Sequence, residues 1–290
     1  MYSGIISGNK TREALMVNLA QKVKSLGHVP VLAIVQVGDR ADSAAFIRAK
    51  SAFGEKVGIK TLHVHLSLGI SQNDLITEID KLNNNKTVSG IIVQLPIPAH
   101  LDRSSVIDAI SPNKDVDALC STSVAAWSQN AKTALLPATA RGVRELLDFY
   151  KIGLKGKKVA VIGRSDLVGK PVAAMCVSEG AEVVVCHSKT EDIQAKTKEA
   201  DIVIVAVGKP KFFGPEYFRS GQVVVDVGIN TITGDKLEEE ISGKKLVGDV
   251  DFEKVKEVVS AITPVPGGVG PMTVLALFEN VVCLAEQAIN

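Results

Sequence analysis

A glycine-bearing segment between residues 158 and 171 has the residue types that bind a pyrophosphate group. The apolar run 158–162 predicts a buried strand, and Gly163 and Gly169 follow it with five residues between them. A helix expected from Val168 would direct its free N–H groups toward this turn, where they can bind phosphate oxygens. The spacing differs from Gly-x-Gly-x-x-Gly, so the fingerprint alone is weak. Strand, turn and helix together predict a dinucleotide site.

The end of the next expected strand, residues 182–186, indicates which dinucleotide binds. His187, Ser188 and Lys189 follow this strand, and no carboxylate comes directly after it. NAD-specific sites usually place an acidic residue there to bind the ribose hydroxyls. Arg164, Ser188 and Lys189 offer hydrogen-bond donors for a 2′-phosphate instead. The pattern favours NADP, and the alternative is that Arg164 and Lys189 are solvated surface residues.

A second glycine-rich segment, residues 263–273, holds three prolines and three glycines. Neither a helix nor a hydrogen-bonded strand is expected to run through it, because proline lacks an N–H and glycine costs conformational entropy. Glycines in such a segment let a backbone approach a ligand closely. The alternative is a rigid loop with no ligand. A helical pattern, residues 274–288, follows the segment.

Short apolar runs alternate with helical patterns along most of the chain. The runs show little polar alternation, which is typical of parallel strands buried on both faces. Expected strands are residues 31–37, 90–94, 158–162, 182–186, 202–207, 223–227 and 246–247. Expected helices include residues 12–26, 43–57, 75–83, 168–178 and 190–199. This alternation predicts α/β architecture.

A polar, glycine-bearing turn at residues 153–157 separates two groups of elements. A helical stretch, residues 141–150, precedes the turn, and the strand pattern restarts after it. We therefore expect one domain at residues 1–139 and a second at residues 140–273. The last helix, within residues 274–290, is expected to return and pack on the first domain.

Composition excludes several classes of protein. The 290 residues are 46% hydrophobic and 22% charged, with a net charge of +1, so no nucleic-acid surface is indicated. The four cysteines form no Cys-x-x-Cys pair, so neither disulfides nor a metal site is expected. No signal-peptide core opens the chain, and no apolar run approaches the roughly 18 residues that span a bilayer. We expect a cytoplasmic protein whose partners include neither nucleic acid nor a membrane.

Almost from end to end, the chain resembles the bifunctional methylenetetrahydrofolate dehydrogenase/methenyltetrahydrofolate cyclohydrolase family. The resemblance rests on segments in a fixed order: Val37-Gly38, Ser43, Lys50, and residues 90–98, 114–117, 161–171, 186–190, 226–230, 248–250 and 263–273. It implies a homodimer of two-domain α/β subunits. An N-terminal α/β domain would bind folate, a Rossmann-like domain would bind NADP, and folate would lie in the cleft between them.

The activity that the resemblance implies has two steps in one-carbon metabolism and purine biosynthesis. NADP+ takes a hydride from 5,10-methylenetetrahydrofolate, and the resulting methenyl cation is hydrolysed to 10-formyltetrahydrofolate. Lys50 would accept the proton in the second step, which a lysine can do when burial or a nearby cation lowers its pKa. Gln94 would orient Lys50 or the water, and Asp117 would bind the pterin edge. Without the resemblance, Lys50 would be read as solvated, Gln94 as a strand-end cap and Asp117 as a turn residue.

The same resemblance implies the remaining contacts and no metal. The substrate-binding residues would be Phe46, Asp117, Pro266, Gly267 and Gly268. The cofactor-binding residues would be Gly163, Arg164, Ser165, Val168, Gly169, His187, Ser188, Ile229 and Thr273. Thr273 would cap the final helix or reach the cofactor.

Departures from the family pattern fall in the folate half. Phe46 stands where the family has a tyrosine four residues before the lysine, so the two side chains share a helix face but the hydroxyl is missing. Ala118 replaces a glycine and restricts positive φ. Residues 137–140 read Pro-Ala-Thr-Ala in place of Pro-Cys-Thr-Pro. Our hypothesis is that hydride transfer survives and that cyclohydrolase activity is weakened.

Two other functions compete with this interpretation. An inactive or nearly inactive paralogue would still bind NADP and folate, and it would form no methenyl product. An unrelated dehydrogenase, acting on shikimate or an amino acid, could use a similar two-domain scaffold. The segments 94–96 and 263–273 argue against the unrelated dehydrogenase.

Overall fold

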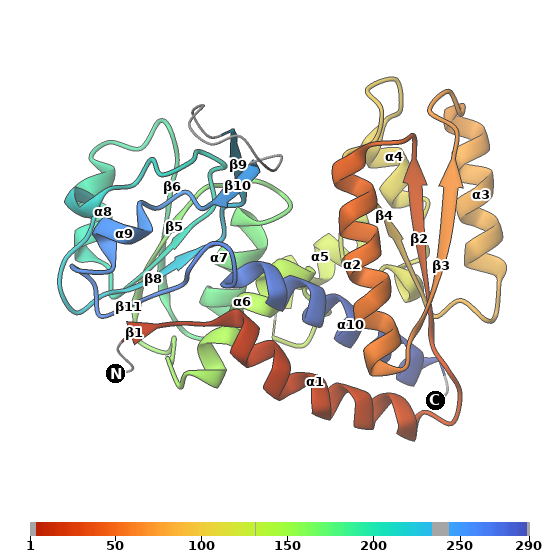
Figure 1. Ribbon diagram of the computed structural model, residues 1–290, viewed down its shortest axis with the longest axis horizontal. Coiled ribbons are helices and arrows are strands. Elements are labelled where there is room, and N and C mark those ends of the chain that lie inside the picture. The colour runs from red at the N-terminus through yellow and green to blue at the C-terminus, as the bar shows by residue number, and fades with distance from the viewer. Residues whose placement is uncertain (1–3, 131, 234–243, 289–290) are drawn as a thin grey trace, which may run out of the picture. The chain divides into compact units, whose positions relative to one another are not determined.

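The computed structural model describes residues 4–130, 132–233 and 244–288 (Figure 1). Contacts divide the chain into two units: an N-terminal unit, residues 13–138 with the chain from Val274, and a second unit, residues 139–273 with the chain up to Arg12. This division differs from the expected limits mainly at residues 4–12, which join the second unit because β1 (Gly4–Ile5) pairs with β11 (Ala261–Ile262). The expected limits also include residues 1–3, 131, 234–243 and 289–290, which lie outside the described residues.

A three-stranded parallel sheet forms the centre of the N-terminal unit. Its order is β3 (Lys60–Leu66), β2 (Val31–Val37), β4 (Gly90–Val93). Figure 1 shows α2 (Ala41–Val57) and α3 (Gln72–Asn84) on opposite sides of this sheet. The sequence predicted β2 and β4, whose residues are nearly all buried. It missed β3, an edge strand that is largely exposed and carries polar residues.

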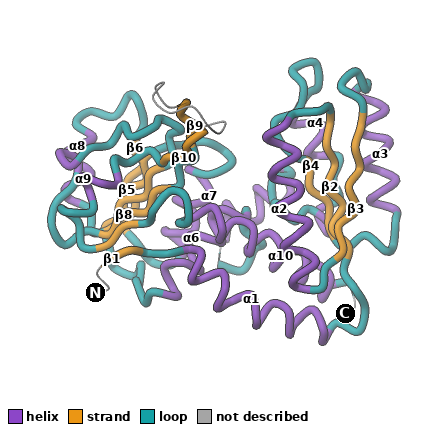
Figure 2. Tube along the Cα trace, in the orientation of Figure 1, coloured by secondary structure: helices purple, strands orange, loops and turns teal. Residues whose placement is uncertain are grey.

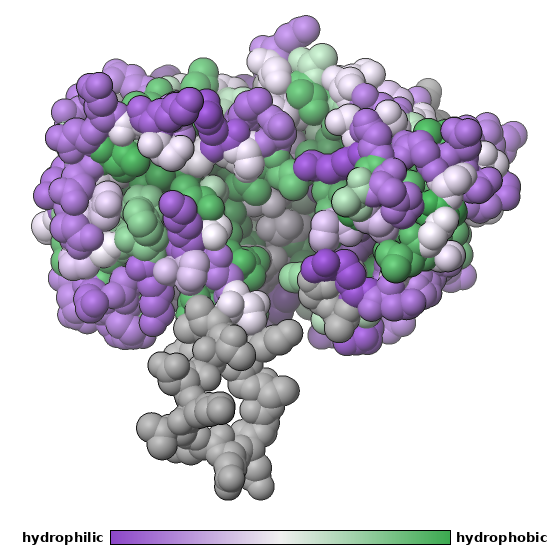
Figure 3. Space-filling view, turned by 90° about the horizontal axis from the view of Figure 1, so that it is seen from above, coloured by the Kyte–Doolittle hydropathy of each residue, from purple (hydrophilic) through white to green (hydrophobic). Residues whose placement is uncertain are grey.

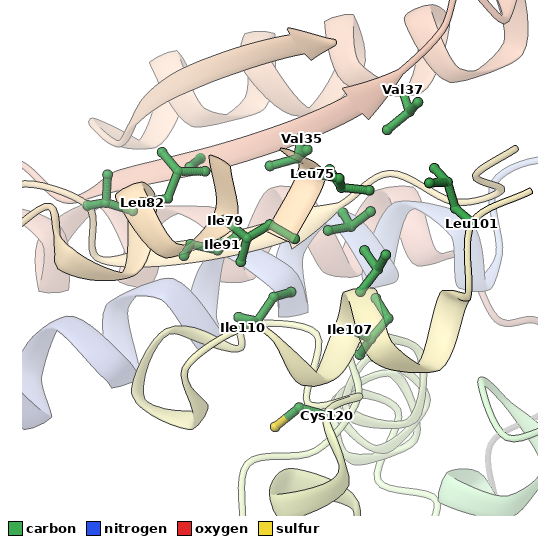
Figure 4. Packing of buried hydrophobic residues seen from close by; sticks show 14 residues of the cluster. Val35, Val37, Leu75, Ile79, Leu82, Ile91, Leu101, Ile107, Ile110 and Cys120 are labelled. Atoms are coloured by element: carbon green, nitrogen blue, oxygen red, sulfur yellow. The ribbon is translucent and has the colours of Figure 1, made fainter. Parts of the chain in front are cut away.

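The helix α3 shows how the core of this unit is built (Figure 4). Ser71 caps its N-terminus by accepting a hydrogen bond from the Asp74 N–H. Leu75, Ile79 and Leu82 recur at helical spacing, so they form one buried stripe against the sheet. Full burial of each leucine or isoleucine contributes about 1.5–3 kcal/mol. The remaining elements of this unit are α4 (Arg103–Asp108), η1 (Pro112–Lys114) and α5 (Ser121–Asn130).

The second unit contains a six-stranded parallel sheet with helices packed around it (Figure 2). The strand order is β1, β11, β8 (Val223–Asp226), β7 (Ile202–Val205), β5 (Lys158–Ile162), β6 (Glu182–Cys186). Its helices are α7 (Gly169–Ser178), α8 (Ile193–Glu199) and α9 (Phe252–Val255), with the short η2 (Pro215–Tyr217). A two-stranded hairpin pairs β9 (Asn230–Thr233) with β10 (Lys244–Val247). The predicted two-domain α/β architecture is confirmed, and each unit contains a parallel sheet.

Three helices have residues in both units: α1 (Gly8–Ser25), α6 (Ala138–Phe149) and α10 (Val269–Gln287). The prediction that α10 begins at residue 274 was wrong. The helix begins at Val269 and includes Pro271 in its first turn. Proline is tolerated there because the first N–H groups of a helix have no intrahelical partner.

Among the described residues, α10 is also the one helix that meets the length and composition of a membrane span. This outcome differs from the expectation that no segment would do so. In its most apolar window, 61% of the residues are buried, which is the pattern of a core helix. On the face that Figure 3 shows, each unit carries many hydrophilic residues with apolar areas among them.

Candidate active site

Lys50 and Gln94 form a hydrogen-bonded pair in the N-terminal unit. Lys50 lies on α2, and its Nζ donates to Oε1 of Gln94 at 2.8 Å. Gln94 directly follows β4, where its N–H donates to the carbonyl of Val35 at 2.8 Å. Its Nε2 donates to the carbonyl of Leu95 at 2.9 Å, so Oε1 is left to face Lys50. The pair holds the lysine amine in one orientation.

Burial lowers the pKa of Lys50 from its usual value, and the nearby Asp117 carboxylate partly opposes this effect. A lowered pKa increases the fraction of neutral amine near neutral pH. A neutral, oriented amine can accept a proton from water, which is the role expected of this residue.

Asp117 is the third member of this group. Burial is the largest cause that raises its pKa to about 6, and Asp115 raises it further. The Lys50 ammonium, the Ala138 N–H and Arg103 act in the opposite direction. The charges of Lys50 and Asp117 act on each other's pKa, so Asp117 belongs to the electrostatic surroundings of the Lys50–Gln94 pair. We call Lys50, Gln94 and Asp117 the Lys50 cluster.

Sequence analysis assigned no role to three residues that fix the segment carrying Asp117, although two of them belong to the segment 114–117 on which the resemblance rests. Lys114 donates to the carbonyls at the C-terminus of α3, at distances of 2.7–3.0 Å. The buried carboxylate of Asp115 accepts from the N–H of Cys120 at 2.8 Å. Asn280, on α10, donates to the carbonyl of Val116 at 2.8 Å. The charged residues Lys114 and Asp115, so close to Asp117, are a signal that the sequence shows. The amide of Asn280 has no such signal, because it lies on a helix far along the chain.

Ala118 adopts the left-handed conformation that the sequence comparison with the family anticipated. Its φ is 51° and its side chain is fully buried. Its carbonyl accepts a hydrogen bond from Nε1 of Trp127 at 3.1 Å. The left-handed region costs an L-residue roughly 1–2 kcal/mol. Alanine at this position therefore bears a conformational cost that the glycine of the family pattern would avoid. Ala140, in the first turn of α6, is also fully buried.

Phe46 lies one helical turn before Lys50 on α2, and 52% of its surface is exposed. A phenyl ring in that position can stack on a flat ligand, and it offers no hydroxyl to Lys50. Its contact with substrate stays a prediction.

The dinucleotide turn of the second unit has the expected form. Gly163 directly follows β5 with φ of 121°, and a side chain there would overlap the carbonyl of Ala206. A side chain on Gly169, the first residue of α7, would overlap the carbonyl of Gly163. Val168 directly precedes that helix, and the hydroxyl of Ser165 accepts from the Gly169 N–H at 3.3 Å. Only glycines permit this close turn, which fits a pyrophosphate at the helix start.

Strand pairing brings the other predicted cofactor residues to the same edge of the sheet. Ile162 pairs with Cys186, so Arg164 and Ser188 follow neighbouring strands, and both are exposed. His187 anchors the second turn, since its N–H donates to Oγ1 of Thr190 at 3.0 Å. Residues 187–189, directly after β6, include no acidic residue. Hydrogen-bond donors stand there instead, and donors suit a 2′-phosphate.

Two predicted cofactor residues lie further along the chain. Ile229 follows β8 and is 50% exposed, so it is available to a ligand. Thr273 lies inside α10, where its hydroxyl donates to the carbonyl of Val269 at 3.4 Å. It therefore does not cap this helix, because α10 begins at Val269, five residues earlier than expected.

The glycines of the segment 263–273 have a structural role that sequence analysis did not foresee. Gly267 has φ of 98°, and its carbonyl accepts from the N–H groups of Gly8 and Asn9 at 2.8 and 3.2 Å. A side chain on Gly268 would overlap the carbonyl of Pro264. The segment thus caps the N-terminus of α1. Pro266 lines a pocket of about 470 Å³ beside β10, and substrate contacts from these residues stay predictions.

The sequence matches two family descriptions, one after the other. Residues 6–117 match the catalytic domain of tetrahydrofolate dehydrogenase/cyclohydrolase, and residues 137–289 match the NAD(P)-binding domain of the same family. The chain belongs to the tetrahydrofolate dehydrogenase/cyclohydrolase family.

Full-length relatives agree with this family. The bifunctional protein FolD of Bacillus licheniformis is 42% identical over 293 residues, covering 100% of both chains. FolD of Rickettsia massiliae is 41% identical over 284 residues, covering 97% of this chain and 96% of the relative.

Solved structures of the family have the same fold. The Campylobacter jejuni FolD dehydrogenase/cyclohydrolase superposes with a TM-score of 0.92 at 39% identity, covering 98% of this chain and 99% of the other. The Trypanosoma brucei enzyme, complexed with NADP cofactor and inhibitor, has a TM-score of 0.93 at 33% identity, with 100% of both chains covered. Membership of the tetrahydrofolate dehydrogenase/cyclohydrolase family confirms the resemblance found in the sequence and sets aside the unrelated dehydrogenase.

Among the described residues, no group of three or more His, Cys, Asp or Glu side chains could hold a metal ion.

Proposed function

We propose that this protein oxidises 5,10-methylenetetrahydrofolate with NADP+ and hydrolyses the methenyl product to 10-formyltetrahydrofolate. The observation that carries the proposal is the Lys50–Gln94 pair beside Asp117, with the pKa of Lys50 lowered by burial. Family membership and the glycine turn of the second unit support NADP as the cofactor.

For the dehydrogenase step, the residues mainly hold the reactants. NADP+ supplies the hydride acceptor when bound. Gly163, Gly169 and the start of α7 would hold its pyrophosphate, and Arg164 and Ser188 its 2′-phosphate. Asp117, when ionised, pairs with the two donors of the pterin 2-amino-pyrimidine edge. The methenyl cation is stabilised by its own two nitrogens, so correct placement contributes more than proton transfer.

The cyclohydrolase step requires a base. Water adds to the bridging carbon of the methenyl cation while neutral Lys50 accepts one of its protons. The bond from that carbon to N5 then breaks, N5 takes up one proton, and the other is released to solvent. Gln94 keeps the amine directed toward the reacting carbon through the 2.8 Å hydrogen bond. General-base catalysis of this kind contributes typically about 10²–10⁴-fold.

We further propose that Phe46 weakens the hydrolytic step relative to the oxidation. The phenyl ring sits one turn from Lys50 and lacks a hydroxyl that could orient the amine or relay a proton. In Phe46→Tyr, cyclohydrolase kcat should rise by about tenfold, with dehydrogenase kcat/KM changed less than twofold. Exposed Phe212 gives a matched Phe212→Tyr control, for which neither step should change. Equal rates of the two steps in the wild type would contradict the weakening.

The competing function is a paralogue that binds both ligands without turnover. Adding 5,10-methylenetetrahydrofolate and NADP+ to purified protein distinguishes the two. Formation of the near-ultraviolet methenyl chromophore supports the enzyme, whereas binding of both ligands by calorimetry without the chromophore supports the paralogue.

Two wider expectations rest on the family resemblance and composition alone. We propose that the protein is a homodimer and acts in the cytoplasm. Light scattering after gel filtration at micromolar concentration tests the first, with a single-chain mass as the contradicting result. Imaging of the tagged protein tests the second.

A further inference from the structure

The buried carboxylate of Asp249 is surrounded by hydrogen-bond donors of the second unit. Asp249 is fully buried, two residues after β10. Oδ2 accepts from the N–H groups of Val207 and Gly208 at 2.6 and 2.9 Å. Oδ1 accepts from the N–H of Lys209 and from Nδ2 of Asn230, both at 2.8 Å. One side chain therefore fixes three successive amides after β7 and the first residue of β9.

Both segments that Asp249 holds lie next to the expected cofactor site. The carbonyl of Ala206, directly before the three amides, occupies the space that a side chain on Gly163 would need. Asn230 follows Ile229, an expected cofactor contact. The segment after β7 is thus the neighbour of the dinucleotide turn at the carboxyl edge of the parallel sheet, where ligands of such sheets bind.

A second buried carboxylate fixes Asp249 itself. Oδ1 of Asp226 accepts from the N–H groups of Gly228 and Asp249 at 2.9 and 3.1 Å, and Oδ2 accepts from Val250 at 2.9 Å. The N–H of Asp226 donates to the hydroxyl of Thr263 at 2.7 Å. The two aspartates connect the segments that follow β7, β8, β10 and β11.

The two carboxylates occupy space beside glycines that have no side chain to fill it. A side chain on Gly228 would overlap the Asp249 carboxylate, and one on Gly248 would overlap the Asp226 carboxylate. Burying a carboxyl group is costly unless donors surround it, and each of these groups accepts several hydrogen bonds. Such an arrangement determines where the backbone lies, because each N–H that donates to a fixed carboxyl oxygen is itself fixed.

We propose that Asp249 is a positioning residue for the nicotinamide cofactor, acting through residues 207–209 and Asn230. This inference rests on the proposed function, since it assumes that the second unit binds NADP. In this role Asp249 acts indirectly: it fixes the position of residues 207–209, which lie beside the Gly163 turn.

The test is Asp249→Asn in the full-length protein. Asparagine has the same size but directs an NH2 group at backbone N–H donors, so residues 207–209 must shift. We expect the NADP+ dissociation constant, measured by calorimetry, and the KM for NADP+ to rise about tenfold or more. Hydrolysis of added methenyltetrahydrofolate, which needs no cofactor, and the KM for folate should change less than twofold.

Asp251→Asn is the matched control, because that carboxylate lies two residues away and pairs with the exposed Lys254 at 2.9 Å. It should leave NADP+ affinity unchanged. If Asp249→Asn does not fold, Asn230→Ala removes one donor to the same carboxylate, and a smaller rise in the NADP+ dissociation constant is expected.

Unchanged NADP+ affinity in the folded variant would overturn the proposal. An equal fall of hydrolysis and oxidation would overturn it as well, because that result indicates a merely structural carboxylate. Failure of the proposed function is distinguishable: the wild type would then show no methenyl formation, while the effect of the substitution on NADP+ binding would still be measured.

Discussion

Lys50 and Asp117 show how burial and mutual attraction set the charges of a site at the scale of single residues. Burial disfavours the charged form of both, so it lowers the pKa of Lys50 and raises that of Asp117 to about 6. Their attraction acts against both shifts. The result is a base with a larger neutral fraction beside a carboxylate that is ionised at neutral pH and titrates just below it.

The raised pKa of Asp117 predicts that folate binding weakens in mild acid. Pterin recognition requires the ionised carboxylate, so the KM for folate should rise about tenfold between pH 7 and pH 5. Stability should change in the opposite direction. Because the folded pKa of about 6 exceeds the unfolded value of 3.8, the contribution of Asp117 to the unfolding free energy is present below pH 4 and is lost as pH rises through about 6.

Steady-state kinetics and thermal melts across pH 5–8, on wild type and Asp117→Asn, check both effects. In the variant, the KM should be high at every pH and the pH dependence should flatten. A wild-type KM that stays constant from pH 7 to pH 5 would show that the carboxylate is not the pterin ligand or does not titrate there.

At the scale of elements, α10 fixes the segment that carries Asp117. Asn280 is fully buried on this helix, and its Nδ2 donates to the carbonyls of Val116 and Leu136 at 2.8 and 3.0 Å. Val116 precedes Asp117, and Leu136 lies two residues before Ala138, whose N–H bonds to the Asp117 carboxylate. One amide thus holds both segments around the carboxylate.

Substituting Asn280→Leu should leave both carbonyls buried and unsatisfied. We expect a loss of about 2–4 kcal/mol in unfolding free energy and a raised KM for folate, with NADP+ affinity unchanged. Urea unfolding and calorimetry provide the measurements. Gln287→Leu, an exposed amide on the same helix, should cost less than about 0.5 kcal/mol. Equal effects of the two substitutions would argue against this role.

Sequence patterns predicted the helices and strands whose local signals were strong. They did not predict features that depend on contacts between residues far apart in the chain. Buried apolar runs gave β2, β4 and the strands of the larger sheet, whereas the polar edge strand β3 carried no such run. The start of α10 was misplaced because proline and glycine were read as helix breakers, although a first turn tolerates them. Lys50, Gln94 and Asp117 were identified through family resemblance. The roles of Asp249 and Asn280 were not predicted, because their hydrogen-bond partners are distant in sequence.

At the scale of the whole molecule, the expected roles separate by unit. The Lys50 cluster lies within the N-terminal unit, and the glycine turn and the two buried aspartates lie within the second. Of the departures from the family pattern, Phe46 and Ala118 lie in the N-terminal unit, whereas Ala140 lies at the start of the second. Oxidation needs the Lys50 cluster and the cofactor site of the second unit, whereas hydrolysis needs only the Lys50 cluster. Substitutions can therefore affect the two steps separately.

The most direct test of the account is the substitution Lys50→Met, assayed for both steps. Methionine keeps a long side chain and removes the amine that accepts the proton. Hydrolysis of methenyltetrahydrofolate should fall at least about 100-fold, whereas oxidation of methylenetetrahydrofolate with NADP+ should fall by less than about tenfold, since hydride transfer needs no base. Hydrolysis at the wild-type rate, or an equal loss of both activities, would contradict the assignment of Lys50 as the base.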